Sequence, residues 1–220
     1  GIYRRKSEIV KGILYIGMSP FLMNLCACLI VILINRGLKE HGGDMAIGAY
    51  GIVNRVVFLF IMIIMGFNQG MQPIAGYNFG ARQYSRVTEV TKLTMKWAIG
   101  VATTGFLLCQ LFPSVIVRMF TTDPELIEAA VYGLHIVFAV FPIVGFQMVT
   151  TNFFISIGMS KKAIFLSLTR QMLFLVPCLL ILPRWFGTLG VWISIPIADT
   201  TATIVTALVL INQFRKFHSK

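Results

Sequence analysis

Long uncharged stretches limit the folds open to this sequence more than any other feature. Uncharged runs of 24, 21 and 32 residues occupy positions 12–35, 97–117 and 129–160. A helix needs about 20 apolar residues to cross the roughly 30 Å of hydrocarbon in a bilayer. Each run is therefore long enough for one membrane-spanning helix, and a soluble globule has no way to bury so much continuous apolar chain.

Three further apolar stretches carry one charge each, namely Arg55, Arg170 or Asp199. A single charge does not prevent a stretch of this length from spanning a membrane. The sequence therefore predicts an all-α integral membrane protein with six transmembrane helices, at approximately 14–35, 46–71, 95–118, 129–156, 163–183 and 188–211.

The charges are few and unevenly placed. Only 12% of the residues are charged, against about 25% in a typical soluble domain, and 19 Lys and Arg against 8 Asp and Glu give a net charge of +11. Thirteen basic residues fall at the chain ends and around 72–94 and 157–162, and four fall in the alternate connections. Cytoplasmic loops retain Lys and Arg. We therefore expect a plasma-membrane protein with both chain ends cytoplasmic, and no binding of nucleic acid.

The residues that usually carry catalysis or bind metals are scattered. The four cysteines all fall inside predicted spans, so we expect them to pack rather than to form a disulfide or zinc site. No HExxH motif, carboxylate pair or nucleophile with a base is present. His135, near the start of the fourth span, is expected to be a wet interfacial residue. We therefore predict no metal site, no cofactor and no enzymatic activity.

Four prolines stand out inside the predicted spans. Each proline frees a backbone carbonyl and bends its helix, and broken helices at membrane depth are tolerated where they line a watery cavity. One interpretation is a set of mild structural kinks, and the other is a moving bundle that lines a cavity. The prolines concerned are Pro20, Pro142, Pro177 and Pro196.

Polar residues inside the spans indicate where such a cavity lies. Gln147, Thr151 and Phe154 recur at i, i+4 and i+7, so an amide, a hydroxyl and a ring share one helix face. That face suits a cavity for amphipathic cations, and the alternative is a polar seam between helices. The other candidate cavity residues are Asn24, Asn54, Arg55, Gln69 and Asn152.

Asp199 is the one acidic residue inside a predicted span. A carboxylate near mid-membrane is costly enough that proton or cation coupling is the first hypothesis. The alternative is a structural role, bonded to Thr200, Thr203 or a neighbouring helix. Arg170 lies eight residues after Lys162, close enough to the cytoplasmic start of its span that its side chain is expected to snorkel to the cytoplasmic face.

A motif rich in glycine, GFNQGMQPIAGYNFGARQYSRV at 66–87, closes the second span. Its first three glycines, Gly66 among them, are expected to permit close helix approach, and its proline to end the helix. The last glycine would release the chain into a basic loop at 82–96. We expect a hinge beside a rigid bundle, as alternating access requires, built from Gly70, Pro73, Gly76, Tyr77, Asn78 and Gly80.

This motif resembles the signature of the MATE family, the multidrug and toxic compound extrusion transporters. The segments at 121–130, 150–177 and 190–199 are also similar to this family, most of all to its MepA-like bacterial branch. The resemblance implies twelve helices in two six-helix lobes, with residues 1–220 as the C-terminal lobe. The N-terminal lobe would be absent from this chain, which opens on Gly1 and is therefore expected to be part of a longer protein.

The family resemblance also implies a function. It implies secondary-active export of bulky organic compounds, often cationic drugs, in exchange for Na⁺ or H⁺. The partners would be those compounds, the lipid bilayer and the N-terminal lobe of the same polypeptide. Some Na⁺-coupled branches carry acids in the first and fourth helices of this lobe, where this sequence has Cys26, Cys28 and Gln147. Coupling is then expected from the other lobe or from Asp199.

The alternative within the superfamily is a flippase of lipid-linked saccharides. Such a protein would need more basic residues in the cavity to hold pyrophosphate. Only Arg55 and Arg170 are candidates. A purely structural membrane subunit would leave Asp199 and the polar face at 147–154 unexplained.

Overall fold

The structure, a computed structural model, describes residues 7–218, and every element in that range is helical. Four basic residues counted above, Arg4, Arg5, Lys6 and Lys220, lie outside it. The elements are α1 (Ser7–Gly80), α2 (Tyr84–Leu111), α3 (Pro113–Arg118), α4 (Pro124–Phe138), α5 (Phe141–Ser156), α6 (Ser160–Leu168), the π-helix η1 (Thr169–Leu175), α7 (Val176–Phe186) and α8 (Thr188–His218).

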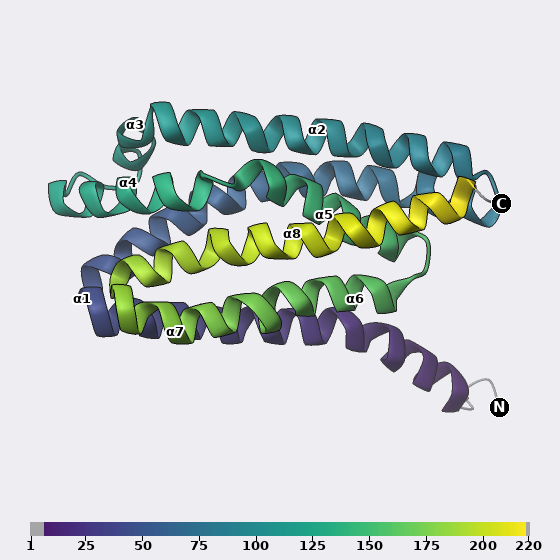
Figure 1. Ribbon diagram of the computed structural model, residues 1–220, viewed down its shortest axis with the longest axis horizontal. Helices are drawn as coiled ribbons and strands as arrows, with labels where there is room; N and C mark the ends of the chain where they lie inside the picture. The colour runs from purple at the N-terminus through teal and green to yellow at the C-terminus, as the bar shows by residue number, and fades with distance from the viewer. Residues whose placement is uncertain (1–6, 219–220) are drawn as a thin grey trace, which may run out of the picture.

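Helix α1 contains the first reversal of the chain. Its first part runs to one end of the bundle and its second part returns to the other (Figure 1). Gly43, with φ 65° and ψ −160°, is the position inside α1 with non-helical angles, and this region of φ/ψ space is open almost only to glycine. The expected connection at 36–45 is therefore not a loop, because one glycine suffices to turn the chain.

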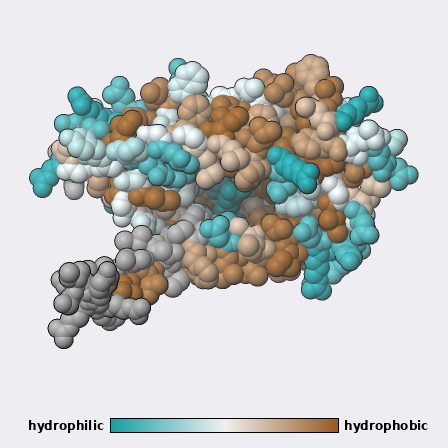
Figure 2. Space-filling view, turned by 180° about the vertical axis from the view of Figure 1, so that it is seen from behind, coloured by the Kyte–Doolittle hydropathy of each residue, from teal (hydrophilic) through white to brown (hydrophobic). Residues whose placement is uncertain are grey.

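The bundle has one basic end. The end of α1, the start of α2, the connection from α5 to α6 and the end of α8 all lie there (Figure 1). The basic residues of that end include Arg82, Arg86, Lys161 and Lys216. In the view of Figure 2, hydrophobic residues fill the middle of the molecule and hydrophilic residues gather towards both ends. That distribution is typical of a chain that crosses an apolar layer.

Three stretches of the described chain are long and apolar enough to cross a membrane: Asn24–Gly80, Ser160–Phe186 and Thr188–Phe217. The pair α4 and α5, bent by 55°, makes a fourth if it is counted as one span. Helix α2 is long enough at 28 residues, but Lys96 and several threonines lower its hydropathy.

Prolines break some helices and not others. The bend between α4 and α5 precedes Pro142, and η1 precedes Pro177, so both expected irregularities are present. Helix α8 runs unbroken through Pro196. The predicted span at 95–118 covers the later part of α2, which begins at Tyr84, and all of α3, and a break before Pro113 separates the two helices.

The glycine-rich motif also differs from expectation. Pro73 is exposed and does not end the helix, which continues to Gly80. The basic loop expected at 82–96 is instead a tight turn followed by α2. Neither Gly66 nor Gly70 has a heavy atom of another element near its Cβ position. Only Gly76 allows a close approach, since a Cβ there would lie 3.0 Å from the backbone oxygen of Ser156.

Close packing between α2 and α5 holds the centre of the bundle. A Cβ on Gly145 would lie 2.8 Å from the backbone oxygen of Ala98, so this glycine lets the two backbones meet. His135 on α4 is half-buried, and its Nδ1 lies 2.7 Å from Oε1 of Gln110 on α2. The side-chain amide of Gln110 also donates to the backbone oxygen of His135 at 2.9 Å. His135 is therefore hydrogen-bonded between α4 and α2 and is not only a solvated interfacial residue.

A polar pocket between α5 and η1 as candidate functional site

A cavity of about 200 Å³ lies among α5, α6 and η1. Two residues of the predicted polar face, Gln147 and Thr151, line it together with Asn152, another predicted cavity residue. The complete lining is Gln147, Met148, Thr151, Asn152, Leu166, Ser167, Arg170 and Gln171.

Two glutamines that line this cavity each have an oxygen without a hydrogen-bond partner among the described residues. Oε1 of Gln147 and Oε1 of Gln171 are both buried and unpartnered, and Gln147 is only 3% exposed. A buried acceptor without a donor costs about 1–3 kcal/mol. Neither oxygen has appreciable accessible surface, so both face the protein interior.

The other polar side chains of the cavity are already bonded. Thr151 donates its hydroxyl to the backbone oxygen of Gln147 at 3.0 Å. Asn152 donates to the backbone oxygen of Met148 at 2.9 Å and accepts from Nε2 of Gln72 on α1 at 3.1 Å. These bonds fix the side chains of Thr151 and Asn152 in the cavity wall.

Arg170 in the cavity wall forms an ion pair with a buried carboxylate of α8. Arg170 on η1 donates from Nε to Oδ1 of Asp199 on α8 at 2.7 Å. The side chain of Asp199 is 6% exposed and that of Arg170 is 31% exposed. The expectation that Arg170 snorkels to the cytoplasmic face is therefore wrong, because the carboxylate on the neighbouring helix holds its guanidinium inside the bundle.

Of the structural partners expected for Asp199, the one found lies on a neighbouring helix, namely Arg170 on η1. Thr200 donates to the backbone oxygen of Pro196, and Thr203 donates to the backbone oxygen of Asp199, so neither hydroxyl reaches the carboxylate. Helix η1 is π-helical, with the N–H of Val176 bonded to the oxygen of Gln171. Such bulges are frequent at functional sites, and this one carries two of the residues that line the cavity.

Phe154 does not share the cavity with the polar residues. Its side chain is fully buried, its ring lies 5.1 Å from that of Phe153, and the ammonium of Lys162 lies 5.3 Å from its centroid. The prediction of one face at i, i+4 and i+7 is wrong for this ring, because α5 packs it into the aromatic core.

The candidate cavity residues on α1 lie elsewhere. Asn24, Asn54, Arg55 and Gln69 are all exposed, and none of them lines the cavity. Within the hinge motif, Tyr77 is 78% exposed, whereas Asn78 is buried and donates to the backbone oxygen of Ile74 at 2.8 Å. The structure thus separates the predicted residues into a cavity set on α5 and an exposed set on α1.

Sequence reasoning missed several residues of the site. Gln171 and Ser167 line the cavity. Away from the cavity, both amide atoms of Asn68 on α1 are buried without a partner among the described residues. The pairing of Arg170 with Asp199 had a signal in the sequence, since each is the lone charge of its predicted span. A charge in each of two spans is best satisfied by the other.

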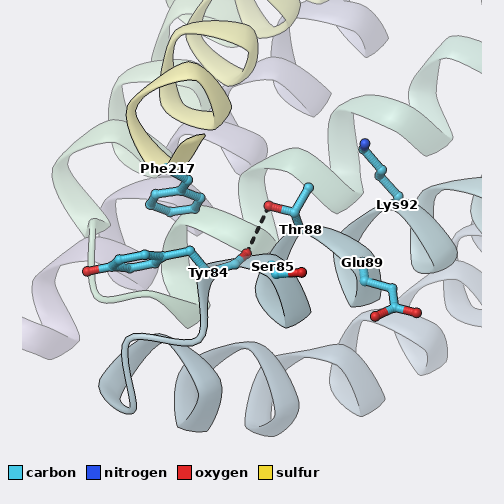
Figure 3. Close-up of a pocket in the computed structure, with 6 residues that line it drawn as sticks. All are labelled: Tyr84, Ser85, Thr88, Glu89, Lys92 and Phe217. Atoms are coloured by element: carbon cyan, nitrogen blue, oxygen red, sulfur yellow. Dashed lines mark hydrogen bonds between the residues drawn. The ribbon is translucent and has the colours of Figure 1, made fainter. Parts of the chain in front are cut away.

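A second groove, of about 490 Å³, lies at the basic end and is drawn in Figure 3. The ring of Tyr84 stacks on Phe217 with centroids 4.9 Å apart, and Thr88 donates to the backbone oxygen of Tyr84. Its charged lining residues, Glu89 and Lys92, are exposed. No predicted cavity residue lines this groove, so the polar pocket remains the candidate site.

Comparison with known proteins identifies what the chain is similar to. The sequence model of the MatE family matches residues 16–180. The chain is 30% identical over 207 residues to "Multidrug export protein MepA" of Staphylococcus aureus (strain N315), and 27% identical over 206 residues to the protein of that name from Staphylococcus haemolyticus (strain JCSC1435). Each alignment covers 92% of this chain and 44% of the relative. The chain therefore spans less than half the length of these relatives.

Solved structures of MATE transporters are also similar to this chain. The MATE multidrug transporter DinF-BH is 40% identical with a TM-score of 0.84, and the match covers 99% of this chain and 49% of that one. A multidrug resistance MATE family transporter of the MOP superfamily, in its outward-facing conformation, superposes with a TM-score of 0.88 at 22% identity, over 99% of this chain and 49% of that one. The second likeness concerns the fold alone.

Proposed function

Since this chain belongs to the MATE family of transporters, we propose that it is one lobe of a secondary-active multidrug exporter. The exporter would carry organic, often cationic, compounds out of the cell in exchange for Na⁺ or H⁺. One observation carries the proposal: Arg170, which lines a polar cavity in an otherwise apolar bundle, is paired with the buried carboxylate of Asp199. Transport proteins place ionisable groups at such sites within the membrane. Export of a compound requires no catalytic residues.

The lobe would consist of residues 1–220 and would cross the membrane six times, at the spans predicted above. The stretch Asn24–Gly80 has 57 residues, about 85 Å of helix, which is far too long for one crossing. The reversal at Gly43 supports two crossings there. The N-terminal lobe of the same polypeptide would supply the other half of the transporter, as the lengths of the relatives support.

The exposed set on α1 would face the other lobe or the main substrate passage. Asn24, Asn54, Arg55 and Gln69 are polar side chains exposed on an apolar helix, and lipid is a poor environment for them. A passage between two lobes, with water or substrate in it, is a more favourable environment for polar side chains than lipid. The motif from Gly70 to Gly80 would then hinge the lobe at its basic end.

Asp199 would be the coupling residue of this lobe. Its carboxylate is neutralised by Arg170 in this conformation. A cation or proton that reaches the carboxylate would weaken this bond and free the guanidinium, so the two arrangements would differ in which group holds the charge. A ligand shifts a conformational equilibrium only through such a difference in binding. Efflux measured under separate Na⁺ and H⁺ gradients identifies which of the two ions is coupled to transport.

The flippase alternative is less well supported. It requires cationic groups that are free to hold a pyrophosphate. Arg170 is paired with Asp199, and Arg55 lies outside the cavity. No named relative supports a saccharide substrate.

We propose that the basic end of the bundle faces the cytoplasm of a bacterial cell. A cysteine introduced at Asp44, beside the reversal of α1, is expected to react with an impermeant thiol reagent added outside the cell. A cysteine at Lys161 is expected to react only after the membrane is permeabilised. Labelling followed by mass-shift electrophoresis checks both, in a background without the native cysteines. The reverse pattern would contradict this orientation.

Transport itself is tested with the full-length protein in proteoliposomes. A fluorescent lipophilic cation is loaded, and Na⁺ and H⁺ gradients are imposed separately. We expect efflux under one gradient and little under the other, because a single coupling site binds one ion preferentially. Efflux under neither gradient, with protein shown to be folded, would contradict the proposed function and favour the flippase.

A further inference from the structure

A smaller pocket at the basic end of the bundle is separate from the polar pocket between α5 and η1. Its volume is about 250 Å³, and its lining residues come from the end of α1, the start of α2, the start of α6 with the turn before it, and the end of α8. The apolar part of its wall consists of Phe79, Tyr84, Met159 and Phe217. The stacked rings of Tyr84 and Phe217, drawn in Figure 3, also line the neighbouring groove, so the two hollows share an aromatic wall.

The polar part of the wall is cationic. It consists of Lys162 on α6 together with Gln213 and Lys216 on α8, and none of the described residues that line this pocket is acidic. The two ammonium groups are close enough to repel each other. Because like charges on two helices face one pocket, an anion in that pocket is attracted by both of them.

Hydrogen bonding and an aromatic contact position the first of these lysines. Nζ of Lys162 donates to Oε1 of the buried Gln213 at 2.5 Å and lies 5.3 Å from the ring centroid of Phe154. An ammonium group has three hydrogens, so Lys162 has two more than the one that Gln213 accepts. Lys162 is half-buried and Lys216 is exposed. The pocket therefore combines a lysine held in the bundle with one at its surface.

The position of the pocket along the bundle indicates which anion it meets. Lys162 directly precedes the predicted span at 163–183, and Lys216 follows the one at 188–211. Both lysines then lie at the boundary between hydrocarbon and water, at the level of the lipid headgroups. Basic pockets between transmembrane helices bind the headgroups of anionic lipids. A volume of about 250 Å³ is below the roughly 300–1,000 Å³ that enclose a drug-sized ligand, so it suits a headgroup whose acyl chains lie outside.

We propose that this pocket binds the headgroup of an anionic phospholipid, such as phosphatidylglycerol, with its phosphate between Lys162 and Lys216. The bound phosphate offsets the repulsion of the two ammonium groups and connects α6 to α8, so the lipid stabilises the bundle. A zwitterionic phospholipid has the same phosphate but brings a positive charge of its own, and it binds less tightly. This inference rests on the proposed spans and goes beyond the proposed transport.

Addition of lipid to the full-length protein in detergent tests the inference. The midpoint of thermal unfolding is measured as dioleoylphosphatidylglycerol or dioleoylphosphatidylcholine is titrated into the micelles, and the dependence on lipid gives an apparent Kd. We expect the apparent Kd of phosphatidylglycerol to be lower by about tenfold, the factor that two lysines near an anionic headgroup supply. Inorganic phosphate at the same concentration should leave the midpoint unchanged, because it has no acyl chains to keep it at the protein surface.

Substitutions at the basic end identify the source of this preference. Lys162→Gln with Lys216→Gln removes both charges from the pocket, so the ratio of apparent Kd values should fall to about threefold or less. Lys216→Gln alone alters an exposed residue and should also lower the ratio, which keeps the test valid if the double variant folds poorly. The matched control is Lys161→Gln with Arg215→Gln. These exposed neighbours do not line the pocket, so the same loss of charge should leave the ratio near tenfold.

The outcomes distinguish a lipid site from its alternatives. Equal apparent Kd values for the two lipids, or a preference that survives the loss of both lysines, would overturn the inference. An equal loss of preference in the control pair would assign it to the overall charge of this end and would overturn the pocket as the site. A shift produced equally by inorganic phosphate would make the ligand a free anion and would overturn a lipid partner. If the full-length protein moves no dye in proteoliposomes, the proposed function fails, while the unfolding midpoints in detergent still decide this inference.

Discussion

Asp199→Asn is expected to reduce drug efflux at least tenfold and to destabilise the protein at the same time. The asparagine keeps the shape of the side chain but leaves the Arg170 guanidinium without its counter-charge. Removing one partner of a fully buried pair costs about 3–5 kcal/mol. Because the Arg170 side chain is 31% exposed, we expect a smaller loss of about 2 kcal/mol. Drug resistance at matched expression and thermal unfolding of the purified protein measure the two effects.

A double substitution separates the two roles of this pair. In Arg170→Met with Asp199→Leu no charge is left unpaired, so stability should return to within about 1 kcal/mol of the parent. Efflux should stay lost, because the group that exchanges the cation is gone. Asp44→Asn, at an exposed position beside the reversal of α1, is the control and should leave both unchanged. Full resistance in Asp199→Asn would instead restrict Asp199 to a structural role.

Gly190→Ala is expected to cause the largest loss of stability among simple substitutions. A Cβ at Gly190 would lie 2.6 Å from the backbone nitrogen of Pro183 and closer still to the carbonyl of Leu182. These are backbone atoms of α7, so α7 and α8 would have to separate. Overpacking of this kind costs about 3 kcal/mol or more. The midpoint of thermal unfolding measures the effect.

The matched control is the same substitution in open space. Gly100 lies in the middle of α2, and no heavy atom of another element lies within 4 Å of its Cβ position. Gly100→Ala should therefore raise stability by about 0.5–1 kcal/mol, since glycine is the poorer helix former. A similar loss in both variants would contradict the close contact between α7 and α8.

Several site predictions depended on periodicity and succeeded only in part. Gln147 and Thr151 lie on one cavity wall, as their spacing of four indicates. Phe154 does not, because an aromatic ring gains more from the core around Phe153 than from a polar pocket. The prediction that Pro73 ends its helix is wrong as well, since α1 continues to Gly80. A proline removes one donor and bends a helix, but packing on either side can carry the helix through it.

The sequence by itself determined that the chain is helical, that it suits a membrane, and that its basic residues gather at one end of the bundle. These properties depend on the local cost of placing each residue in lipid or water, and that cost is additive along the chain. The tertiary structure decided which polar groups meet. Arg170 and Asp199 are 29 residues apart and pair only because η1 and α8 are rotated towards each other. Gln147 and Gln171 line one cavity for the same reason, since helix rotation is set by packing over the whole bundle.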